Sequence, residues 1–452
     1  MGKFNYLTAP PATEKMPPAT PFIIANEAFE RFAFYGAKCI LAIFMTQYLL
    51  GRGGALDVMT EPQSRMWVHV FVAITYFMTI VGALLSDIWL GKYKTIIIFN
   101  IVYCLGFLCL ALDITRLGFF SGLILVAIGS GVVKPCVSAN VGDQFGKTNK
   151  HLMSRLYGWF YFSINVGAVI STWFVPLVLK YKGAKVAFAV PMVFMFLATI
   201  TYILGRKKFV HISARGLYAV QKDINKPALL SLGKLCILFV FVIPFWAIFD
   251  QMDSSWVLLV EKMDRNIDLG FVSFSIESSQ ATLLNPLLVL IFIPFFSYIV
   301  YPLINKFFPL TELRKISLGL FLAITVFVVP ALVQRQVSAG TQVNFIWMVP
   351  AYILLTAAEV MVSITCLEFA YTQAPKTIKS FVTSAFLLSI SLGNAFAALV
   401  NKLIQNPDGT SKLPGTSYYW FFVIVMLVTA VLFVFVASLY KEKTYIQDEE
   451  GV

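Results

Sequence analysis

The sequence predicts an all-α integral membrane protein with about twelve transmembrane helices in two six-helix bundles. Of its 452 residues, 59% are hydrophobic and only 13% are charged, whereas soluble domains are about 45–50% apolar and about 25% charged. Apolar stretches recur along the chain, each near the roughly 20 residues that a helix needs to cross a bilayer. One long basic segment separates the first six stretches from the last six.

The predicted spans are apolar runs bounded by polar, charged or glycine residues. In order they are Phe22–Leu50, Trp67–Leu85, Thr95–Asp113, Leu117–Asn140, Leu156–Leu179 and Val186–Leu204, then Leu235–Asp250, Leu283–Ile304, Ile316–Val333, Phe345–Tyr371, Ser380–Leu403 and Tyr418–Tyr440. This order predicts a tail at residues 1–21, a helix bundle at 22–205, a linker at 206–231, a second bundle at 232–440 and a tail at 441–452.

The distribution of basic residues predicts the orientation. With both termini in the cytoplasm, roughly 21 of the 35 Lys and Arg residues lie on inside segments, as membrane proteins prefer. We therefore expect a multi-pass protein of the cell membrane (the inner membrane in a bacterium) with cytoplasmic tails and linker. Two six-helix halves joined in this way are typical of a secondary transporter of the major facilitator kind, whose substrate binds near the midplane between the halves.

The first span carries unusual charge. The stretch "NEAFERFAFYGAK" places Glu27, Glu30, Arg31 and Lys38 in an otherwise apolar run, although each charge at a bilayer centre costs about 2.5–3.5 kcal/mol on insertion scales. Their helical spacing puts all four on one face, which must contact protein or water rather than lipid. A cluster that only fixes helix packing is the structural alternative, but buried ion pairs stabilise less than apolar packing does.

Other spans add charges of both signs. Lys134 lies in the fourth span beside Pro135, which we expect to break the helix locally. Asp250 ends the seventh predicted span, and Glu359 lies within the tenth. A cavity lined by both signs suits a zwitterionic substrate, a proton relay, or both.

Three further polar residues are candidates. Ser363 follows Glu359 by one turn on the same face, and His69 lies in the second span, where a histidine can change its charge near neutral pH. After the second span, "GALLSDIWLGKYK" predicts a loop. Its Asp87 either latches neighbouring helices at the cytoplasmic face or belongs to a basic turn without a gating function.

The charged first span resembles a known pattern. Residues Glu27–Tyr35 read "EAFERFAFY", similar to the E-x-x-E-R-F-x-Y-Y motif of the proton-dependent oligopeptide transporters, within the major facilitator superfamily. The similarity runs from about Ala25 to about Gly393, through "GALLSDIWLGKYKT", "KPCVSANVGDQF", "FYFSINVGA", "FWAIFDQMDSSW", "LLNPLLVLI" and "EVMVSITCLEFAYTQAP". It implies symport of di- and tripeptides with protons, driven by the proton gradient, without a cofactor or metal.

The resemblance also implies residue roles. The proton-coupling residues would be Glu27, Glu30, Arg31, Lys134 and His69. Arg31 and Lys134 would also recognise the peptide carboxylate, and Glu359 its amino group. The other substrate-binding residues would be Tyr35, Lys38, Tyr76, Asn165, Trp246, Asn285 and Ser363.

Lys38 and Asp250 are expected to gate the outer side. Lys38 lies about 16 Å beyond Glu27 along the helix, toward the outside in the predicted orientation. Asp250 ends a predicted span that also runs outward, so the two charges can meet. Asp87 is the third expected gating residue, at the opposite face.

The chain departs from the family pattern at three positions. Phe34 replaces a usual tyrosine and removes a hydroxyl, and Lys38 stands where arginine is common, which exchanges a bidentate fork for a point charge. Ser297 stands where an acid is frequent. These departures concern the choice of peptide rather than the transport class.

Three other functions are alternatives. A related transporter could carry another solute, such as nitrate or a drug, although the complete acid–arginine pattern with Glu359 favours the two charged ends of a peptide. A membrane-embedded enzyme is disfavoured, because the sequence has only three histidines and neither an H-E-x-x-H motif nor a G-x-S-x-G elbow. A receptor that senses peptides without moving them is the third.

Overall fold

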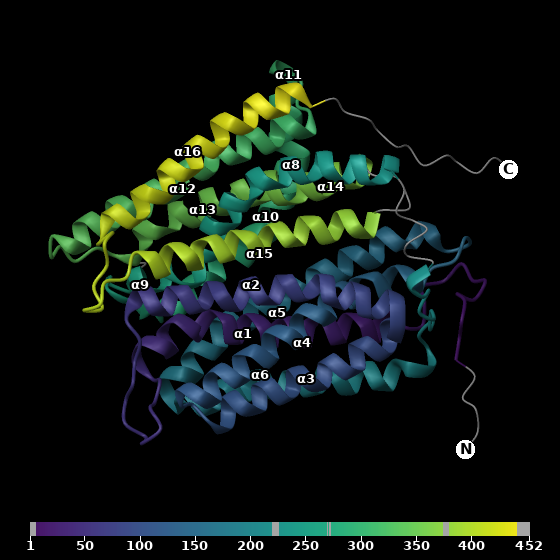
Figure 1. Cartoon of the computed structure of the whole chain (residues 1–452), viewed down its shortest axis with the longest axis horizontal. Helices are drawn as coiled ribbons and strands as arrows, with labels where there is room; N and C mark the ends of the chain where they lie inside the picture. Colours follow the sequence, from purple (N-terminus) through teal and green to yellow (C-terminus); the bar gives the residue numbers. More distant parts are fainter. Residues whose placement is uncertain (1–5, 219–225, 269, 271–272, 374–378, 441–452) are drawn as a thin grey trace. The chain divides into compact units, whose positions relative to one another are not determined.

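The computed structural model describes residues 6–440 except 219–225, 269, 271–272 and 374–378 (Figure 1). The chain divides into two compact units. Residues 1–220 and 279–286 form the first unit, and residues 221–278 and 287–452 form the second. The predicted tail at 441–452 and residues 219–225 of the predicted linker lie outside the described residues.

Six long helices build the first unit. They are α1 Thr20–Gln47, α2 Glu61–Leu85, α3 Lys92–Leu112, α4 Arg116–Asp143, α5 Met153–Lys182 and α6 Ala184–Leu204. Short helical turns at Ser86–Leu90 (π), Lys150–Leu152 and Gly205–Lys207 (3-10) adjoin them. Local sequence explains the helix starts: Thr60 and Gln63 form a capping box before α2, and the Thr115 side chain caps α4.

The second unit repeats this pattern with more interrupted helices. Its helices, including α10 at the boundary between the units, are α8 Lys226–Phe249, α9 Ser255–Glu261, α10 Leu284–Phe295, α11 Tyr301–Phe307, α12 Glu312–Ser338, α13 Val349–Glu359, α14 Thr365–Thr372, α15 Lys379–Leu403 and α16 Thr416–Leu439. The turns that link them are 3-10 at Asp250–Asp253, Ser278–Leu283 and Phe345–Met348, and π at Phe296–Val300 and Val360–Ile364.

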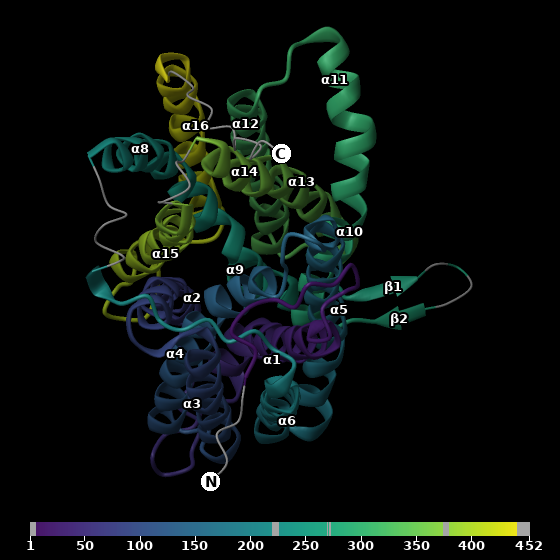
Figure 2. The same ribbon diagram turned by 90° about the vertical axis from the view of Figure 1, so that its right-hand side faces the viewer.

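A short hairpin interrupts the helical pattern. Strand β1 (Asn266–Asp268) pairs antiparallel with β2 (Ser273–Ser275), as Figure 2 shows. At its base, Asp264 accepts hydrogen bonds from the Asn266 backbone N–H and from the Asn344 side chain. These bonds stabilise the charged carboxylate and hold the pKa of Asp264 below its usual value.

The predicted fold class is confirmed. Eleven helices of the described residues are long and apolar enough to cross a membrane. Helix α1 is not one of the eleven because every 18-residue window along it holds at least three charged residues. With α1 added, the described helices reach the expected number of about twelve.

Three local expectations are wrong. The seventh span does not end at Asp250, because the helical path continues through a 3-10 turn to Glu261. Helix α4 continues through Pro135, since neighbouring groups in a membrane bundle can compensate for the missing N–H. The loop expected after Leu85 is a π-helical turn, and Gly91, with a φ of 75°, makes the corner before α3.

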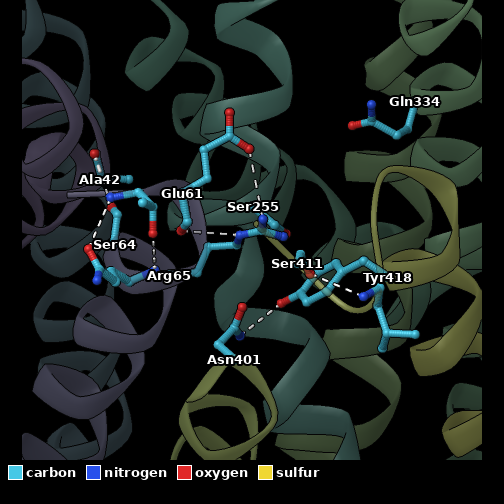
Figure 3. Close-up of polar contacts among 12 residues, drawn as sticks. Ala42, Glu61, Ser64, Arg65, Ser255, Gln334, Asn401, Ser411 and Tyr418 are labelled. Carbon is cyan, nitrogen blue, oxygen red and sulfur yellow. Dashed lines mark hydrogen bonds and ion pairs between the residues drawn. The ribbon is translucent and has the colours of Figure 1, made fainter. Parts of the chain in front are cut away.

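Asparagine–tyrosine hydrogen bonds tie helices together in each unit. In the first, Asn140 Nδ2 of α4 donates to Tyr202 Oη of α6 at 2.7 Å. In the second, Asn401 Nδ2 of α15 donates to Tyr418 Oη of α16 at 3.0 Å (Figure 3). Figure 3 also shows Ser64 of α2, whose hydroxyl donates to the Ala42 carbonyl of α1 at 3.1 Å.

Glycines allow the closest helix contacts in the first unit. A Cβ at Gly82 of α2 would lie 2.5 Å from the backbone oxygen of Val132 in α4. A Cβ at Gly129 of α4 would lie 2.6 Å from Cβ of Tyr103 in α3. Small residues at such crossings are how membrane helices gain packing contacts.

We predict that Gly82→Ala destabilises the protein by about 1–3 kcal/mol, because the added methyl group meets backbone that cannot rotate away. Gly158→Ala is the matched control: it is also a helical glycine, but nothing lies within 4 Å of its added Cβ. Thermal unfolding of the purified protein should show a lower Tm for the first variant only. Equal Tm values for both variants would show that the α2–α4 contact is not as close as described.

Candidate functional site

Three charged side chains of α1 form a buried cluster. Glu27, Glu30 and Arg31 expose only 2%, 1% and 9% of their surfaces. Arg31 Nε donates to Glu27 Oε1 at 2.7 Å and lies 2.9 Å from Glu30 Oε2. Only the contact with Glu27 has hydrogen-bond geometry, since neither Glu30 oxygen has a hydrogen-bond partner within the described residues.

Helix α4 brings Lys134 to this cluster. Its Nζ lies 3.5 Å from the ring centroid of Phe34 and 4.9 Å from that of Tyr76 in α2. It also interacts electrostatically with Glu27 and Glu30. Two acids and two bases from α1 and α4 therefore share one buried region, and their formal charges cancel when all four are ionised.

The Phe34 contact is a finding that sequence reasoning missed. The sequence presents Phe34 only as the loss of a hydroxyl, whereas the structure places its ring under the Lys134 ammonium. Cation–π contacts in dry surroundings stabilise the cation by about 2 kcal/mol. Phe34 is itself 2% exposed and is held by Tyr35 and Phe71, with ring centroids 5.4 and 5.9 Å away.

Two further candidates of the first unit, Lys38 and His69, are also buried. Lys38, one helical turn beyond Phe34, is 4% exposed and is close enough to Lys134 for electrostatic repulsion. His69 of α2 is fully buried. Burial of ionisable groups at these positions requires compensating partners, because an isolated charge costs several kcal/mol in such surroundings.

The two candidate asparagines have different surroundings. Asn165 of α5 is 5% exposed, and its Nδ2 donates to the Tyr161 carbonyl of the same helix at 2.9 Å. Asn285 is 7% exposed and belongs to the segment 279–286, which packs with the first unit. In that segment Gln280 Nε2 donates to the Trp173 carbonyl of α5 at 2.8 Å.

In the segment after the second span, where we considered Asp87 as a latch, the ion pair between helices is made by Lys92. Lys92 Nζ at the start of α3 lies 2.6 Å from Asp143 Oδ2 at the end of α4, and this ion pair joins the two helices. Asp87 contributes its backbone carbonyl, which accepts the Arg215 N–H at 2.7 Å. The gating function of Asp87 stays a prediction.

In the second unit, Asp250 is held by a partner from another helix. Asn394 Nδ2 of α15 donates to Asp250 Oδ2 at 2.7 Å, and Asp250 is 3% exposed. Asn394 lies in the otherwise small and apolar run "SLGNAFAAL", a signal that could have identified it. Trp246 of α8 is 5% exposed and contacts Phe386 edge to face, with ring centroids 6.1 Å apart.

The candidates of the tenth span lie at a helix irregularity. Glu359 is the last residue of α13 and is partly buried, and Ser363 lies in the π-helical turn that follows. Such turns are frequent at functional sites. Ser297, where the family pattern expects an acid, is exposed on another π-helical turn. Within the described ranges, no group of three or more His, Cys, Asp or Glu is placed to hold a metal ion.

Comparison with known proteins identifies the family. The model of the POT family matches residues 93–226 and 218–421. Solute carrier family 15 member 2 of Mus musculus is 34% identical over 372 residues, 71% of this chain and 49% of that protein. Peptide transporter family 1 of Drosophila melanogaster is 32% identical over 354 residues, 68% of this chain and 46% of that protein. The chain thus spans about half the length of these curated relatives.

A solved structure of a POT family transporter matches this chain over almost its whole length. The POT family transporter PepTSo matches with a TM-score of 0.84 and 31% identity, covering 94% of this chain and 99% of that chain. The match confirms the major facilitator fold, and the similar proteins are transporters rather than enzymes. From the family match and the shared fold together, the chain belongs to the POT family.

Proposed function

We propose that the chain is a proton-coupled symporter that imports di- and tripeptides by alternating access. The observation that carries this proposal is the buried, charge-balanced cluster of Glu27, Glu30, Arg31 and Lys134. The relative named peptide transporter family 1 supports a peptide substrate. The proton gradient supplies the energy, and no cofactor takes part.

Charge balance gives a physical reason for coupling. A peptide carboxylate that binds Arg31 or Lys134 adds a negative charge to this four-residue cluster, whose own acids and bases already cancel. Uptake of a proton by Glu27 or Glu30 restores the balance, so binding of substrate and proton favour each other. His69 is the further proposed proton site.

Substrate recognition is proposed to use the two charged ends of the peptide. Arg31 and Lys134 bind the carboxylate, and Glu359 binds the amino group. The other proposed substrate-binding residues are Tyr35, Lys38, Tyr76, Asn165, Trp246, Asn285 and Ser363. Because the Asn165 Nδ2 is engaged by its own helix, its side-chain oxygen is the atom it offers to a peptide N–H.

Gating and topology complete the proposal. Lys38, Asp250 and Asp87 are the proposed gating residues. We place the protein in the cell membrane, or the inner membrane in a bacterium, with both termini in the cytoplasm. The proposed division is a tail at 1–21, bundles at 22–205 and 232–440, a cytoplasmic linker at 206–231 and a tail at 441–452.

We predict that Glu27→Gln and Glu30→Gln each abolish peptide uptake driven by a pH gradient but retain peptide exchange between the two sides of the membrane. Exchange requires alternating access without net proton movement, whereas uphill uptake requires a group that binds the proton. Proteoliposomes with imposed gradients measure both activities.

Glu61→Gln is the control for these variants, because Glu61 lies at the start of α2 and forms an ion pair with Arg65 at 3.8 Å. It should retain both activities. Uphill uptake by both Glu27→Gln and Glu30→Gln would contradict the coupling proposal.

We predict that Phe34→Leu raises the KM for peptide about 5- to 30-fold, because loss of about 1–2 kcal/mol of cation–π stabilisation disfavours the charged Lys134 that binds the carboxylate. Phe34→Tyr keeps the aromatic face and should remain within about twofold of wild type. Concentration-dependent uptake measures the effect. A Phe34→Leu KM equal to that of wild type would mean that the ring contact does not contribute.

We predict that Glu359→Gln reduces discrimination against peptides acetylated at the amino end but keeps discrimination against peptides amidated at the carboxyl end. The first modification removes the charge that Glu359 would bind, and the second acts at Arg31 and Lys134. Competition against a labelled dipeptide measures both penalties. If the acetylation penalty is the same in wild type and variant, Glu359 does not recognise the amino group.

A further inference from the structure

A second set of buried polar side chains lies in the first unit. Asn26 of α1 and Asn100 and Tyr103 of α3 are 1%, 0% and 0% exposed. Within the described residues, neither the oxygen nor the nitrogen of either asparagine amide has a hydrogen-bond partner, and neither does the Tyr103 hydroxyl. Both Glu30 oxygens share this property. Buried polar groups in native proteins are rarely left without partners, so this concentration requires an explanation.

These side chains belong to two helices of the first unit, α1 and α3. Asn26 and Glu30 are separated by four residues on α1, and Asn100 and Tyr103 by three on α3, so each pair lies on one helix face. The Tyr103 hydroxyl is close to the Glu30 carboxylate and to Ser130 of α4. In neither contact does the Tyr103 hydroxyl have good hydrogen-bond geometry. Water can bridge buried polar groups that lie near one another without a well-formed hydrogen bond.

An apolar layer closes one end of this group. Ile23 and Ile96 precede Asn26 and Asn100 by about one turn, and both belong to a single buried cluster with Val133 and Val137 of α4. The two asparagines therefore lie at one level, between this apolar cluster and the level of the Tyr103 hydroxyl.

We propose that the first unit contains an internal water site enclosed by Asn26, Glu30, Asn100 and Tyr103. Glu30 contributes the part of its carboxylate that points away from Arg31. A buried water makes about three hydrogen bonds to otherwise unsatisfied polar groups. The two amides offer donors and acceptors, the tyrosine offers a donor, and the carboxylate accepts. The occupant is water rather than a cation, because the site offers amide and hydroxyl donors that a cation cannot use.

The site gives the two glutamates different partners, a consequence that rests on the proposed function. Glu27 is held by Arg31 through a direct hydrogen bond. Glu30 lies 2.9 Å from Arg31 without hydrogen-bond geometry, and ordered water donates to its ionised carboxylate and can accept its proton. Asn100 and Tyr103 are then positioning residues that hold the water against the Glu30 carboxyl group.

The charged groups that interact with Glu30 come from α1 and α4. Glu27 and Arg31 come from its own helix, and Lys134 from α4 interacts with it electrostatically. The neighbouring helices contribute titratable groups as well, namely His69 and Tyr76 from α2 and Tyr103 from α3. The charged residues of α5 and α6 lie at the helix ends, at Arg155, Lys180, Lys182 and Lys185.

Infrared difference spectroscopy on the full-length protein in lipid tests the water site directly. Stretching bands of internal water shift in oxygen-18 water, and the carboxylic acid band of Glu30 is assigned by its loss in Glu30→Gln. Asn100→Leu has a similar shape but neither donor nor acceptor, so it should remove the water bands. Tyr103→Phe and Asn100→Leu should each shift the frequency of the Glu30 carboxylic acid band, because the carboxyl group loses hydrogen-bond partners.

Tyr202→Phe is the matched control. Tyr202 is also fully buried in the first unit, but its hydroxyl already accepts from Asn140. Its removal should lower Tm without moving the Glu30 band or removing water bands. If Asn100→Leu does not insert correctly into the membrane, Tyr103→Phe alone tests the water site. It removes only one hydroxyl, so the variant should still fold. Absence of isotope-sensitive water bands in wild type, or an unmoved Glu30 band in Tyr103→Phe, would overturn the proposal.

A transport measurement separates this proposal from the proposed function. Tyr103→Phe should reduce gradient-driven uptake at least about fivefold at the wild-type optimum pH and keep peptide exchange within about twofold. If the wild-type protein transports no peptide, the proposed function fails, while the infrared result still decides the water site.

Discussion

The buried ion pair of Arg31 with Glu27 and Glu30 is the constraint on which the structure depends. Charges at membrane depth need protein partners, because lipid offers none. This requirement explains why α1 is buried along most of its length and why Lys134 and the Phe34 ring lie beside it. It also explains the glycine-rich crossings, since close packing of the surrounding helices keeps lipid away from the charges.

The second unit places its polar residues at irregular backbone. Asp250 begins a 3-10 turn inside a long span, and Glu359 precedes a π-helical turn. Irregular backbone at membrane depth is tolerated only where protein or water satisfies its polar groups. The Asp250 carboxylate is likewise satisfied, because Asn394 donates a hydrogen bond to it. These interruptions put carboxylates within helices that are otherwise apolar, where transporters position the groups that bind substrate and ions.

Sequence reasoning predicted what depends on local composition. The spans and the polar face of α1 follow from hydropathy and helical spacing, which is why the fold class could be predicted. The sequence indicated that Asp250 ends a span, because hydropathy cannot show that Asn394, 144 positions away, donates a hydrogen bond to its carboxylate. The Phe34–Lys134 contact also joins distant residues that meet only in the folded bundle, and the burial of Asn26, Asn100 and Tyr103 likewise depends on the folded bundle.

The central claim is that peptide and proton move together, and measuring proton entry with peptide tests it most directly. Wild-type proteoliposomes without an imposed pH gradient would carry a pH-sensitive dye in the lumen, and a dipeptide would be added outside. The account predicts that the lumen acidifies as peptide enters and that a protonophore abolishes the change. Peptide entry at the same rate without acidification would contradict it.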